Sequence, residues 1–327
     1  MDTIAVLIPC HNEERTVAKV VADFRQALPG ASIYVYDNCS TDRTAELAKA
    51  AGAIVRTERK RGKGRVMRRM FREIEALCYI MVDGDDTYPA EAAPAMATAV
   101  LERQADMVVG DRLSGTYFTE NKRKFHNFGN SLVRWCINKI FKSDIKDIMT
   151  GYRAFSYQFV KTFPVLSKGF EIETEMTIHA VYRDMDMENT VIQYRDRPEG
   201  SVSKLNTFSD GFKVLGTIFK LFKSYKPFEF CTLLAILCLV ISIAFLLPVL
   251  GDYFEFGTVP RFPTLIACCF GILTSIMLFI SGIILSSTLQ IDAQAFEFRL
   301  QQVRQWLLAA ASKEGSARQD NAKPVNP

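Results

Sequence analysis

The sequence lacks the marks of a secreted, disulfide-linked or zinc-binding protein. Its eight cysteines include no pair at C-x-x-C spacing, and several lie inside apolar runs, where cysteine acts as a small apolar residue. The first residues contain only a short apolar run, Ile4 to Ile8, with no basic flank, so we expect no secretory signal peptide. We therefore expect no disulfide or zinc framework, and we expect the protein to lie in a reducing compartment.

Internal repeats and low-complexity segments are also missing from the body of the chain. Its 327 residues can hold one α/β domain of ordinary size together with a further segment. Only the tail after Ser312 has the polar composition of a disordered segment.

Two long apolar runs are the most prominent feature that is present. They extend from Phe228 to Leu250 and from Thr264 to Leu289. At about 1.5 Å per helical residue, each run is long enough to cross a hydrocarbon core roughly 30 Å thick. A buried helix of a soluble protein passes the same test, but two such runs joined by a short loop favour a membrane hairpin.

The basic residues around these runs predict how the hairpin is oriented. Lysines precede the first run and arginines follow the second: Lys213, Lys220, Lys223, Lys226, Arg299 and Arg304. The connecting loop carries a single arginine, Arg261. Because positively charged flanks stay in the cytoplasm, we expect a multi-pass protein of the plasma (inner) membrane, with residues 1–227 and both termini cytoplasmic.

The first 205 residues alternate apolar segments with amphipathic ones. The segments predicted as strands are TIAVLIP, SIYVYDN, AIVRT, CYIMVD and ADMVVGDR. Helical periodicity or capping residues follow them, in Glu14 to Leu28, in CSTDRTAELAKAAG, after Gly64 and from Pro89 onward. This alternation predicts an α/β fold with a largely parallel sheet covered on both faces.

Polar clusters follow three of these strands: PCHNEE, DNCSTD and DGDD. Ligands of such sheets bind at the carboxyl ends of the strands. Turn and capping chemistry explains Asn12 or Ser40 equally well when each is taken alone. It does not explain why acidic groups converge on one edge, above all Asp83, Asp85 and Asp86, whose charges repel one another. Either a cation binds at this edge or the carboxylates are simply solvated there.

A glycine-containing basic run, RKRGKGRVMRR, spans residues 59–69. A solvated basic face is the usual interpretation of such a run. The two glycines beside Lys63 would nevertheless let the backbone approach a phosphate, and a helix beginning just after them offers free N–H groups to an anion. With carboxylates for a hard cation nearby, the loop predicts a nucleotide diphosphate bound with Mg²⁺ or Mn²⁺. Nucleic acid is not expected, because the run lacks interleaved aromatic residues.

The order of these segments is that of a known family. IPCHNE, YDNCSTDRT, GKG, VDGDDTYP and MTGYRAF together resemble the family-2 glycosyltransferases of the Rossmann-like GT-A fold. The later GFEIETEM and YRDRPEGSVSK narrow the resemblance to enzymes that charge a polyprenyl phosphate, the dolichyl-phosphate mannosyltransferase and GtrB-like group. The resemblance covers residues 3–205, and the two apolar runs match the GtrB-like architecture.

The resemblance implies a donor pocket and an acceptor site. The donor-binding residues follow the strands or lie in the basic loop: Pro9, Asn12, Glu13, Asp37, Lys63, Asp83 and Arg112. The residues facing the acceptor phosphate are basic or small and polar: Arg123, Arg197, Ser203 and Lys204. A nucleotide sugar and a polyprenyl phosphate lipid are thus the expected partners.

The implied catalytic residues are Asp85 and Asp147. Asp83 and Asp85 would form the D-x-D pair of the family, with Asp85 on the Mg²⁺ or Mn²⁺ and Asp83 shared between metal and nucleotide. The family often has Gln at the position of Thr87, so the third metal ligand stays open. Asp147 would act as a base or orient the acceptor, but pairing with Arg153 or capping a turn explains it equally well.

The implied reaction needs little proton chemistry. The second pKa of a phosphate monoester is about 6, so the acceptor can attack the anomeric carbon without a strong base. No side chain is obviously placed as a covalent relay, which favours a single, inverting displacement. A UDP-sugar, of glucose or N-acetylglucosamine, is favoured as donor; GDP-mannose is the alternative. The polyprenyl-phosphate sugar would serve cell-envelope glycan or glycoprotein assembly.

The segment before the first apolar run has an amphipathic pattern. Its aromatic and aliphatic residues fall near one helical face, with lysines beside them: Phe208, Phe212, Leu215, Phe219 and Phe222. A core-packing helix would show the same face, but the basic character favours a helix in the headgroup layer. The GtrB-like resemblance further implies a homo-oligomer, a tetramer, and small residues at four-residue spacing would let the spans approach closely: Gly271, Ser275, Gly282 and Ser286.

The predicted organisation follows from these segments. It comprises a cytoplasmic glycosyltransferase domain (1–205), an amphipathic juxtamembrane helix (206–227), transmembrane helices (228–250 and 264–289) around an external loop (251–263), and a cytoplasmic helix with a disordered tail (290–327). A processive polysaccharide synthase is excluded, because QQVRQW at 301–306 has Gln305 where its motif requires Trp and follows the last span. A non-catalytic nucleotide-binding membrane scaffold is the remaining alternative, and the intact D-x-D pair argues against it.

Overall fold

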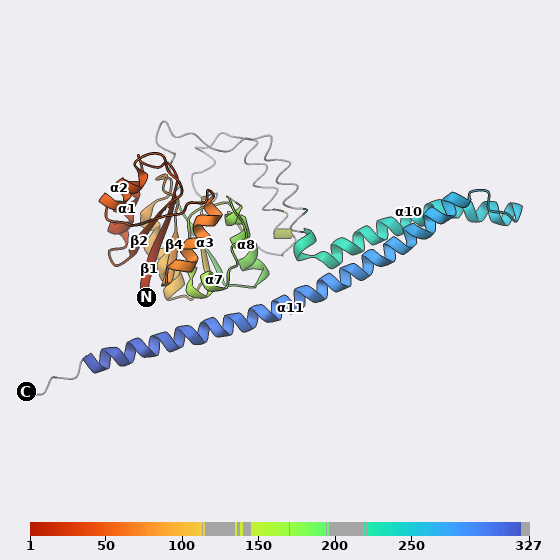
Figure 1. Cartoon of the computed structure of the whole chain (residues 1–327). Helices are drawn as coiled ribbons and strands as arrows, with labels where there is room; N and C mark the ends of the chain where they lie inside the picture. Colours follow the sequence, from red (N-terminus) through yellow and green to blue (C-terminus); the bar gives the residue numbers. More distant parts are fainter. Residues whose placement is uncertain are drawn as a thin grey trace, which may run out of the picture. The chain divides into compact units, whose positions relative to one another are not determined.

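The computed structural model describes residues 1–112, 114, 135, 138–139, 145–169, 171–193, 195, 219 and 222–321, with side chains up to Ala310. The chain divides into two compact units (Figure 1). The N-terminal unit comprises Met1–Thr207 with Phe298–Pro327, and the helical unit comprises Phe208–Glu297.

The N-terminal unit is built on a seven-stranded sheet with the strand order β3-β2-β1-β4-β6-β5-β7. Its strands are β1 (Asp2–Cys10), β2 (Ser32–Asp37), β3 (Ile54–Thr57), β4 (Ala76–Met81), β5 (Met107–Asp111), β6 (Arg153–Ser156) and β7 (Met187–Val191). All neighbours are parallel except β6, which runs antiparallel to both β4 and β5. The predicted α/β fold with a mostly parallel sheet is therefore confirmed.

Two of these strands, β6 and β7, escaped prediction from the sequence. β6 is only four residues long and begins with the fully buried Arg153. β7 lies at the end of the sheet and has the mostly polar sequence MENTV, none of it fully buried. Neither segment shows the apolar run or the alternation that identifies a strand from sequence.

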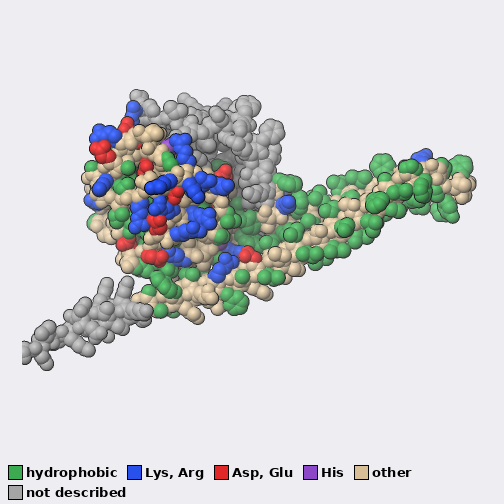
Figure 2. Space-filling view, in the orientation of Figure 1, with side chains coloured by type: hydrophobic (Ala, Val, Ile, Leu, Met, Phe, Trp, Pro, Cys, Tyr) green, Lys and Arg blue, Asp and Glu red, His purple; other side chains and the backbone are tan. Residues whose placement is uncertain are grey.

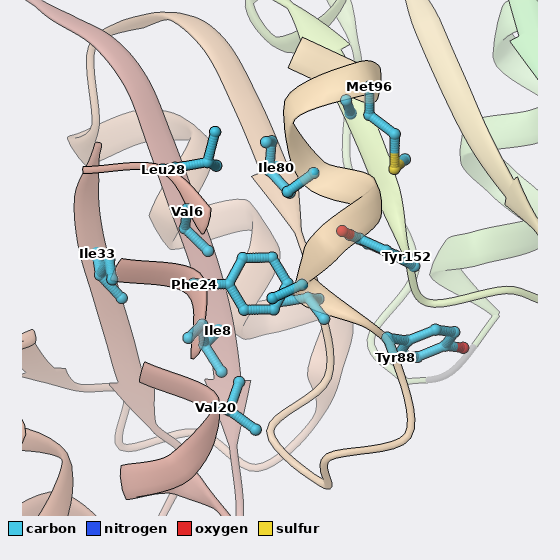
Figure 3. Packing of buried hydrophobic residues seen from close by; sticks show 14 of the residues in the cluster. Val6, Ile8, Val20, Phe24, Leu28, Ile33, Ile80, Tyr88, Met96 and Tyr152 are labelled. Atoms are coloured by element: carbon cyan, nitrogen blue, oxygen red, sulfur yellow. The ribbon is translucent and has the colours of Figure 1, made fainter. Parts of the chain in front are cut away.

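Helices cover both faces of the sheet, each over its own hydrophobic cluster. On one face α1 (Val17–Ala27), α2 (Thr44–Ala50), the 3₁₀ turn η1 (Ala90–Ala92) and α4 (Ala93–Leu101) pack on the strands; on the other lie α3 (Lys63–Glu73), α7 (Tyr157–Thr162) and α8 (Ile172–Tyr182). Because strand side chains alternate, Val6 and Ile8 belong to the first cluster and Leu7 to the second. Figure 3 shows Phe24 of α1 lying among the side chains of the first cluster.

Helix α1 begins at Val17, three positions after the expected start at Glu14, because a turn occupies the intervening residues. Asn12 has a positive φ of 56°, and the backbone N–H groups of Thr16 and Val17 both donate to the carbonyl of Glu13, at 3.1 and 3.0 Å. The Thr16 hydroxyl donates to the carbonyl of Gly84 at 2.6 Å. The loop after β1 is thereby tied to the loop after β4.

The helical unit is formed by α10 (Pro227–Phe256) and the greater part of α11 (Phe262–Asn321). Both helices are long and apolar enough to cross a membrane, and only 17% of the most apolar stretch of each helix is buried. Buried core helices of soluble proteins do not leave so much apolar surface exposed. The two helices thus indicate membrane association.

The helices extend beyond the predicted spans at both ends of the connecting loop and at the C-terminal end. Residues 251–256, expected in the loop, continue α10, which ends in a left-handed Gly257 with φ 67°. Helix α11 runs to Asn321, through the beginning of the tail expected to be disordered. Lys, Glu, Ala, Arg and Gln there are favourable helix formers, which a composition-based prediction of disorder overlooks.

Small residues bring α10 and α11 together within the helical unit. The Ser275 hydroxyl donates to the carbonyl of Ala235 at 2.8 Å. A side chain added at Gly271 would collide with Ser242, and one added at Gly282 would lie 3.0 Å from the Cβ of Cys231. The close approach predicted from small residues therefore occurs between the two helices of one chain. The oligomeric state stays a prediction.

Only part of the predicted juxtamembrane helix, residues 206–227, is described. Phe219 and Phe222 are helical and contact Phe230 of α10 edge-on, with ring centroids 5.1 and 5.8 Å apart. Phe208, Phe212 and Leu215 lie outside the described residues.

Candidate functional site

The loops after β1 and β2 are joined by hydrogen bonds at the carboxyl edge of the sheet. The backbone N–H of Asn12 donates to the Ser40 hydroxyl at 2.9 Å, and the Asn12 carboxamide oxygen accepts from Thr41 N–H at 2.8 Å. The N–H of Glu13 donates to Thr44 Oγ1 at 2.8 Å. These contacts hold Asn12 and Glu13 in fixed positions beside the buried Asp37.

Asn38 links this edge to the basic loop and was not assigned a role from the sequence. Its amide group donates to the carbonyls of Glu58 and Lys60 at 3.0 and 2.9 Å, and its oxygen accepts from Gly62 N–H at 2.7 Å. A carboxylate could accept from Gly62 but could not donate to two carbonyls. The structure thus requires an amide at this position.

Lys63 is the residue of the basic run that turns inward. Its ammonium forms ion pairs with Asp83, at the end of β4, and with Glu173 of α8, the latter at 2.6 Å. Burial alone would lower the pKa of Lys63, but the charges of Asp83 and Glu173 raise it above its usual value. Lys63 was expected on the donor, and here it neutralises the first aspartate of the D-x-D pair.

The other basic residues of the run remain at the surface. Four of them are exposed, namely Arg59, Lys60, Arg61 and Arg68, and two are half-buried, Arg65 and Arg69. Figure 2 shows basic side chains gathered over α3. Their exposure fits the solvated basic face, and a role in binding phosphate stays a prediction.

Asp83 is confined on a second side by a glycine. A Cβ added at Gly151 would collide with the Asp83 carboxylate, Oδ2 in particular. The N–H of Gly151 donates to the Tyr88 hydroxyl at 2.9 Å. Gly151 therefore leaves the space in which the carboxylate lies.

Asp85 and Asp86 have different environments despite being adjacent. Asp85 is 6% exposed, and its Oδ1 accepts from the Thr87 hydroxyl at 2.6 Å. Asp86 has a positive φ of 59° and forms an ion pair with Lys19 of α1 at 2.7 Å. Asp86 thus pairs with a lysine on a helix, and Asp83 and Asp85 stay the candidate ligand pair because they are the two aspartates of the D-x-D motif.

Asp147 is fully buried and paired with Arg112. Arg112 Nε donates to its Oδ2 at 2.8 Å and Nη2 to its Oδ1 at 3.2 Å, and the N–H of Met149 also donates to Oδ1 at 3.2 Å. Arg112 is therefore directed at a carboxylate, although a phosphate was expected. The bidentate pair fixes the orientation of the Arg112 guanidinium relative to Asp147.

Arg153 has other partners than the Asp147 considered from the sequence. Its guanidinium donates to the carbonyls of Ile148 and Thr150 at 2.6 and 3.1 Å and to the Thr177 hydroxyl at 2.8 Å. Burial lowers the pKa of Arg153 to about 10, against the opposing charges of Glu173 and Asp147. The side chain thus ties the segment before β6 to α8.

Comparison with known proteins identifies the family. The sequence profile of "Glycosyl transferase family 2" matches residues 5–162. Glycosyltransferase AglJ of Haloferax volcanii is 34% identical over 227 residues, which cover 69% of this chain and 74% of that protein. The chain belongs to glycosyltransferase family 2. The dolichyl-phosphate hexose transferase of the same organism is 26% identical over 219 residues, covering 67% of this chain and 93% of that enzyme.

The fold of this family-2 glycosyltransferase is GT-A, as expected. Glucosyl-3-phosphoglycerate synthase of Mycobacterium tuberculosis, solved with Mn²⁺, UDP and phosphoglyceric acid, superimposes with a TM-score of 0.52 at 20% identity. The match covers 66% of this chain and 78% of that one. At this identity the likeness concerns the fold alone.

The carboxylates of the glycosyltransferase site fit a divalent cation bound together with a diphosphate. No cluster of three or more His, Cys, Asp or Glu side chains suited to a metal occurs in the part of the chain that the structure describes. Mg²⁺ is commonly bound by one or two carboxylates together with substrate phosphates and waters. Asp83 and Asp85, two positions apart, satisfy that requirement, and the space at Gly151 admits the carboxylate of Asp83.

The remaining predicted residues are placed only in part. Pro9 is half-buried at the end of β1, where it pairs with Tyr36. Arg123, Arg197, Ser203 and Lys204, predicted to face the acceptor phosphate, lie outside the described residues. Glu173 and Asn38 support the predicted residues from behind, through Lys63 and the basic loop, and the quoted GFEIETEM segment was the only sequence signal for Glu173.

Proposed function

We propose that this glycosyltransferase transfers a hexose from a nucleotide sugar to a membrane polyprenyl phosphate in a reaction that requires Mg²⁺ or Mn²⁺. The observation that carries the proposal is the pair Asp83 and Asp85, held by Lys63 and Thr87 at the carboxyl edge of the sheet, in a chain with two helices long and apolar enough to cross a membrane. The similarity to a dolichyl-phosphate hexose transferase supports the class of acceptor.

On the donor side, the residues of the edge would orient the nucleotide sugar. Asp37 would meet the base or ribose, and Asn12 and Glu13 line the same loop. A bound Mg²⁺ or Mn²⁺ would supply positive charge against the negative charge that develops on the leaving diphosphate. Asp83 and Asp85 would hold it, and Lys63 would add a fixed positive charge behind Asp83. A UDP-sugar is the favoured donor, and GDP-mannose is the alternative.

On the acceptor side, the main task of the protein would be to position the acceptor phosphate. The attacking phosphate oxygen is already ionised near neutral pH, since the second pKa of a phosphate monoester is about 6. Asp147, paired with Arg112, would orient the acceptor or hold Arg112 at the phosphates. Direct attack inverts the anomeric centre, so an α-linked donor gives a β-linked product.

The acceptor lipid explains the apolar helices. A polyprenyl chain stays in the bilayer, so the enzyme must work at the membrane surface. We propose that α10 and α11 cross the plasma membrane as a hairpin, with the glycosyltransferase domain and both termini in the cytoplasm, and that the chain assembles into a homo-oligomer, a tetramer.

A screen of donors and acceptors tests the proposal. Purified full-length enzyme in detergent is supplied with undecaprenyl or dolichyl phosphate, Mn²⁺, and radiolabelled UDP-glucose, UDP-N-acetylglucosamine or GDP-mannose. Label passing into the lipid extract, with a β linkage by NMR of the product, is expected for one donor. Binding of nucleotide without transfer from any donor would instead identify a non-catalytic scaffold, and an α-linked product would refute the single displacement.

A further inference from the structure

The carboxylate of Glu173 is buried and forms an ion pair with Lys63, and its charge also acts on the buried Arg153. Lys63 comes from the first turn of α3 and Glu173 from the first turn of α8. The two side chains are 8% and 7% exposed, whereas that of Asp83, the other partner of Lys63, is 28% exposed. The lysine is therefore shared between one carboxylate that faces the site and one that does not.

Close packing holds the backbone on both sides of Lys63 in place. A Cβ at Gly62 would collide with the carbonyl of Lys168, and one at Gly64 with that of Ser167. Gly64 N–H donates to the carbonyl of Gly169 at 3.2 Å. The two glycines thus serve close packing on the segment 167–169, an alternative to the approach of a phosphate.

That segment is itself held by α8. The carboxylate of Glu175 accepts from the N–H groups of Leu166 and Ser167 at 3.1 and 2.9 Å. Glu175 and Glu173 lie in the same turn and carry the same charge, but Glu175 contacts backbone and Glu173 contacts the lysine. Glu175 therefore has a packing role, and Glu173 has an electrostatic one.

We propose that Glu173 is a positioning residue that sets the affinity of the D-x-D site for its divalent cation by holding Lys63 when Asp83 turns to the cation. The inference rests on the metal-dependent function proposed above. An ammonium and a cation compete for Asp83, and a buried ammonium without a partner is strongly unfavourable. Because Glu173 remains beside Lys63, Asp83 can release the ammonium and bind the cation instead. Without the Glu173 charge, Lys63 depends on Asp83 alone and opposes the cation.

Binding of UDP to the full-length enzyme in detergent, measured by calorimetry over a range of Mn²⁺ concentrations and repeated with GDP, tests this inference. Loss of a residue that supports a metal ligand commonly lowers metal affinity by 10–100-fold, so Glu173→Gln should raise the Mn²⁺ concentration for half-maximal UDP binding by about tenfold. Binding of UDP in EDTA should not change. The matched control, Glu175→Gln, removes the neighbouring charge and should leave the Mn²⁺ midpoint in place.

Two further variants keep the test decisive. Glu173→Asp retains the charge at a greater distance from Lys63, so its Mn²⁺ midpoint should lie between those of the wild type and Glu173→Gln. If Glu173→Gln does not fold, a raised midpoint in Glu173→Asp tests the inference in its place. Lys63→Met combined with Glu173→Gln removes the competing ammonium and should return the midpoint toward that of the wild type.

The outcomes distinguish this inference from the function on which it rests. If wild-type binding of UDP and GDP does not depend on Mn²⁺, the metal-dependent function fails and the inference with it. If the wild type depends on Mn²⁺ but Glu173→Gln has the same midpoint, or Glu175→Gln shifts it equally, only the role of Glu173 is refuted.

Discussion

The two units of the chain differ in the side chains that they bury and expose. In the N-terminal unit ionisable side chains are buried with fixed partners: Lys63, Glu173, Asp147, Arg153 and Asp85. In the helical unit large apolar side chains are exposed: Leu233, Leu237, Val240, Phe245 and others along both helices. Figure 2 shows apolar side chains over much of the α10–α11 pair.

The difference shows that the N-terminal unit must provide the partners of its buried charges itself, whereas the helical unit depends on apolar surroundings. Removing a charge from water is strongly unfavourable unless partners are in place, so the N-terminal unit fixes its ion pairs within the fold. An exposed apolar helix is stable where the surroundings are apolar, since its backbone polar groups are satisfied internally. The first unit should therefore be sensitive to single contacts, and the second to the polarity of its surface.

The largest expected effect comes from filling the space beside Asp83. Gly151→Ala would displace the carboxylate, and a misplacement of about 1 Å can lower a rate by about 100-fold. We expect a loss of sugar transfer of at least that order, measured as turnover on the best donor. The control is Gly30→Ala, where an added Cβ meets no atom within 4 Å. Activity near that of the wild type in Gly151→Ala would show that Asp83 is not confined as described.

Removing the buried ammonium tests whether the charges of the N-terminal unit depend on one another. Lys63→Met leaves Asp83 and Glu173 without it, and breaking a buried pair costs about 3–5 kcal/mol. The free energy of unfolding, from chemical denaturation in detergent, should fall by that amount. Adding Glu173→Gln should recover a large part of it. Equal stability of the single and double variants would contradict the coupling.

A charge placed on the helical unit tests the other side of the comparison. Val240, 57% exposed, lies near the middle of α10, where a lysine would cost about 2.5–3.5 kcal/mol in a membrane span. Val240→Lys should reduce the membrane-inserted fraction on cell fractionation. Phe254→Lys, near the end of the helix, should have little effect. Unchanged insertion of Val240→Lys would argue against a membrane around this face.

The smallest expected effect concerns a surface carboxylate of the N-terminal unit. Burial tends to raise the pKa of Glu73, but hydrogen bonds from Arg69, Arg56 and Tyr36 outweigh it and lower the pKa from 4.5 to about 2. The unfolded chain therefore binds more protons, and this stabilisation, present above pH 4.5, should be lost as the pH falls toward 2. Because the side chain is 32% exposed, the contribution should be at most about 1 kcal/mol. Glu73→Gln should flatten the pH dependence of thermal unfolding in this window, and an unchanged slope would contradict the assignment.

The sequence predicted those parts of the molecule that local patterns determine. Apolar segments located β1 to β5, and polar clusters after strands located Asp83 and Asp85. The strands β6 and β7 were missed because they are short or polar. Sequence spacing also could not show that Lys63 reaches Glu173 or that Arg112 pairs with Asp147, because those contacts join segments far apart in the chain and arise only when the sheet and helices assemble.

Sugar transfer with and without a divalent cation tests the central claim, that Asp83 and Asp85 hold a cation and a nucleotide sugar for transfer to a polyprenyl phosphate. Label passing from the best nucleotide-sugar donor into the lipid extract is measured for the wild type and for Asp85→Asn, each in EDTA and after excess Mn²⁺. The account predicts that EDTA abolishes transfer by the wild type, that Mn²⁺ restores it, and that folded Asp85→Asn stays inactive in both conditions. Transfer that continues undiminished in EDTA, or in Asp85→Asn, would contradict it.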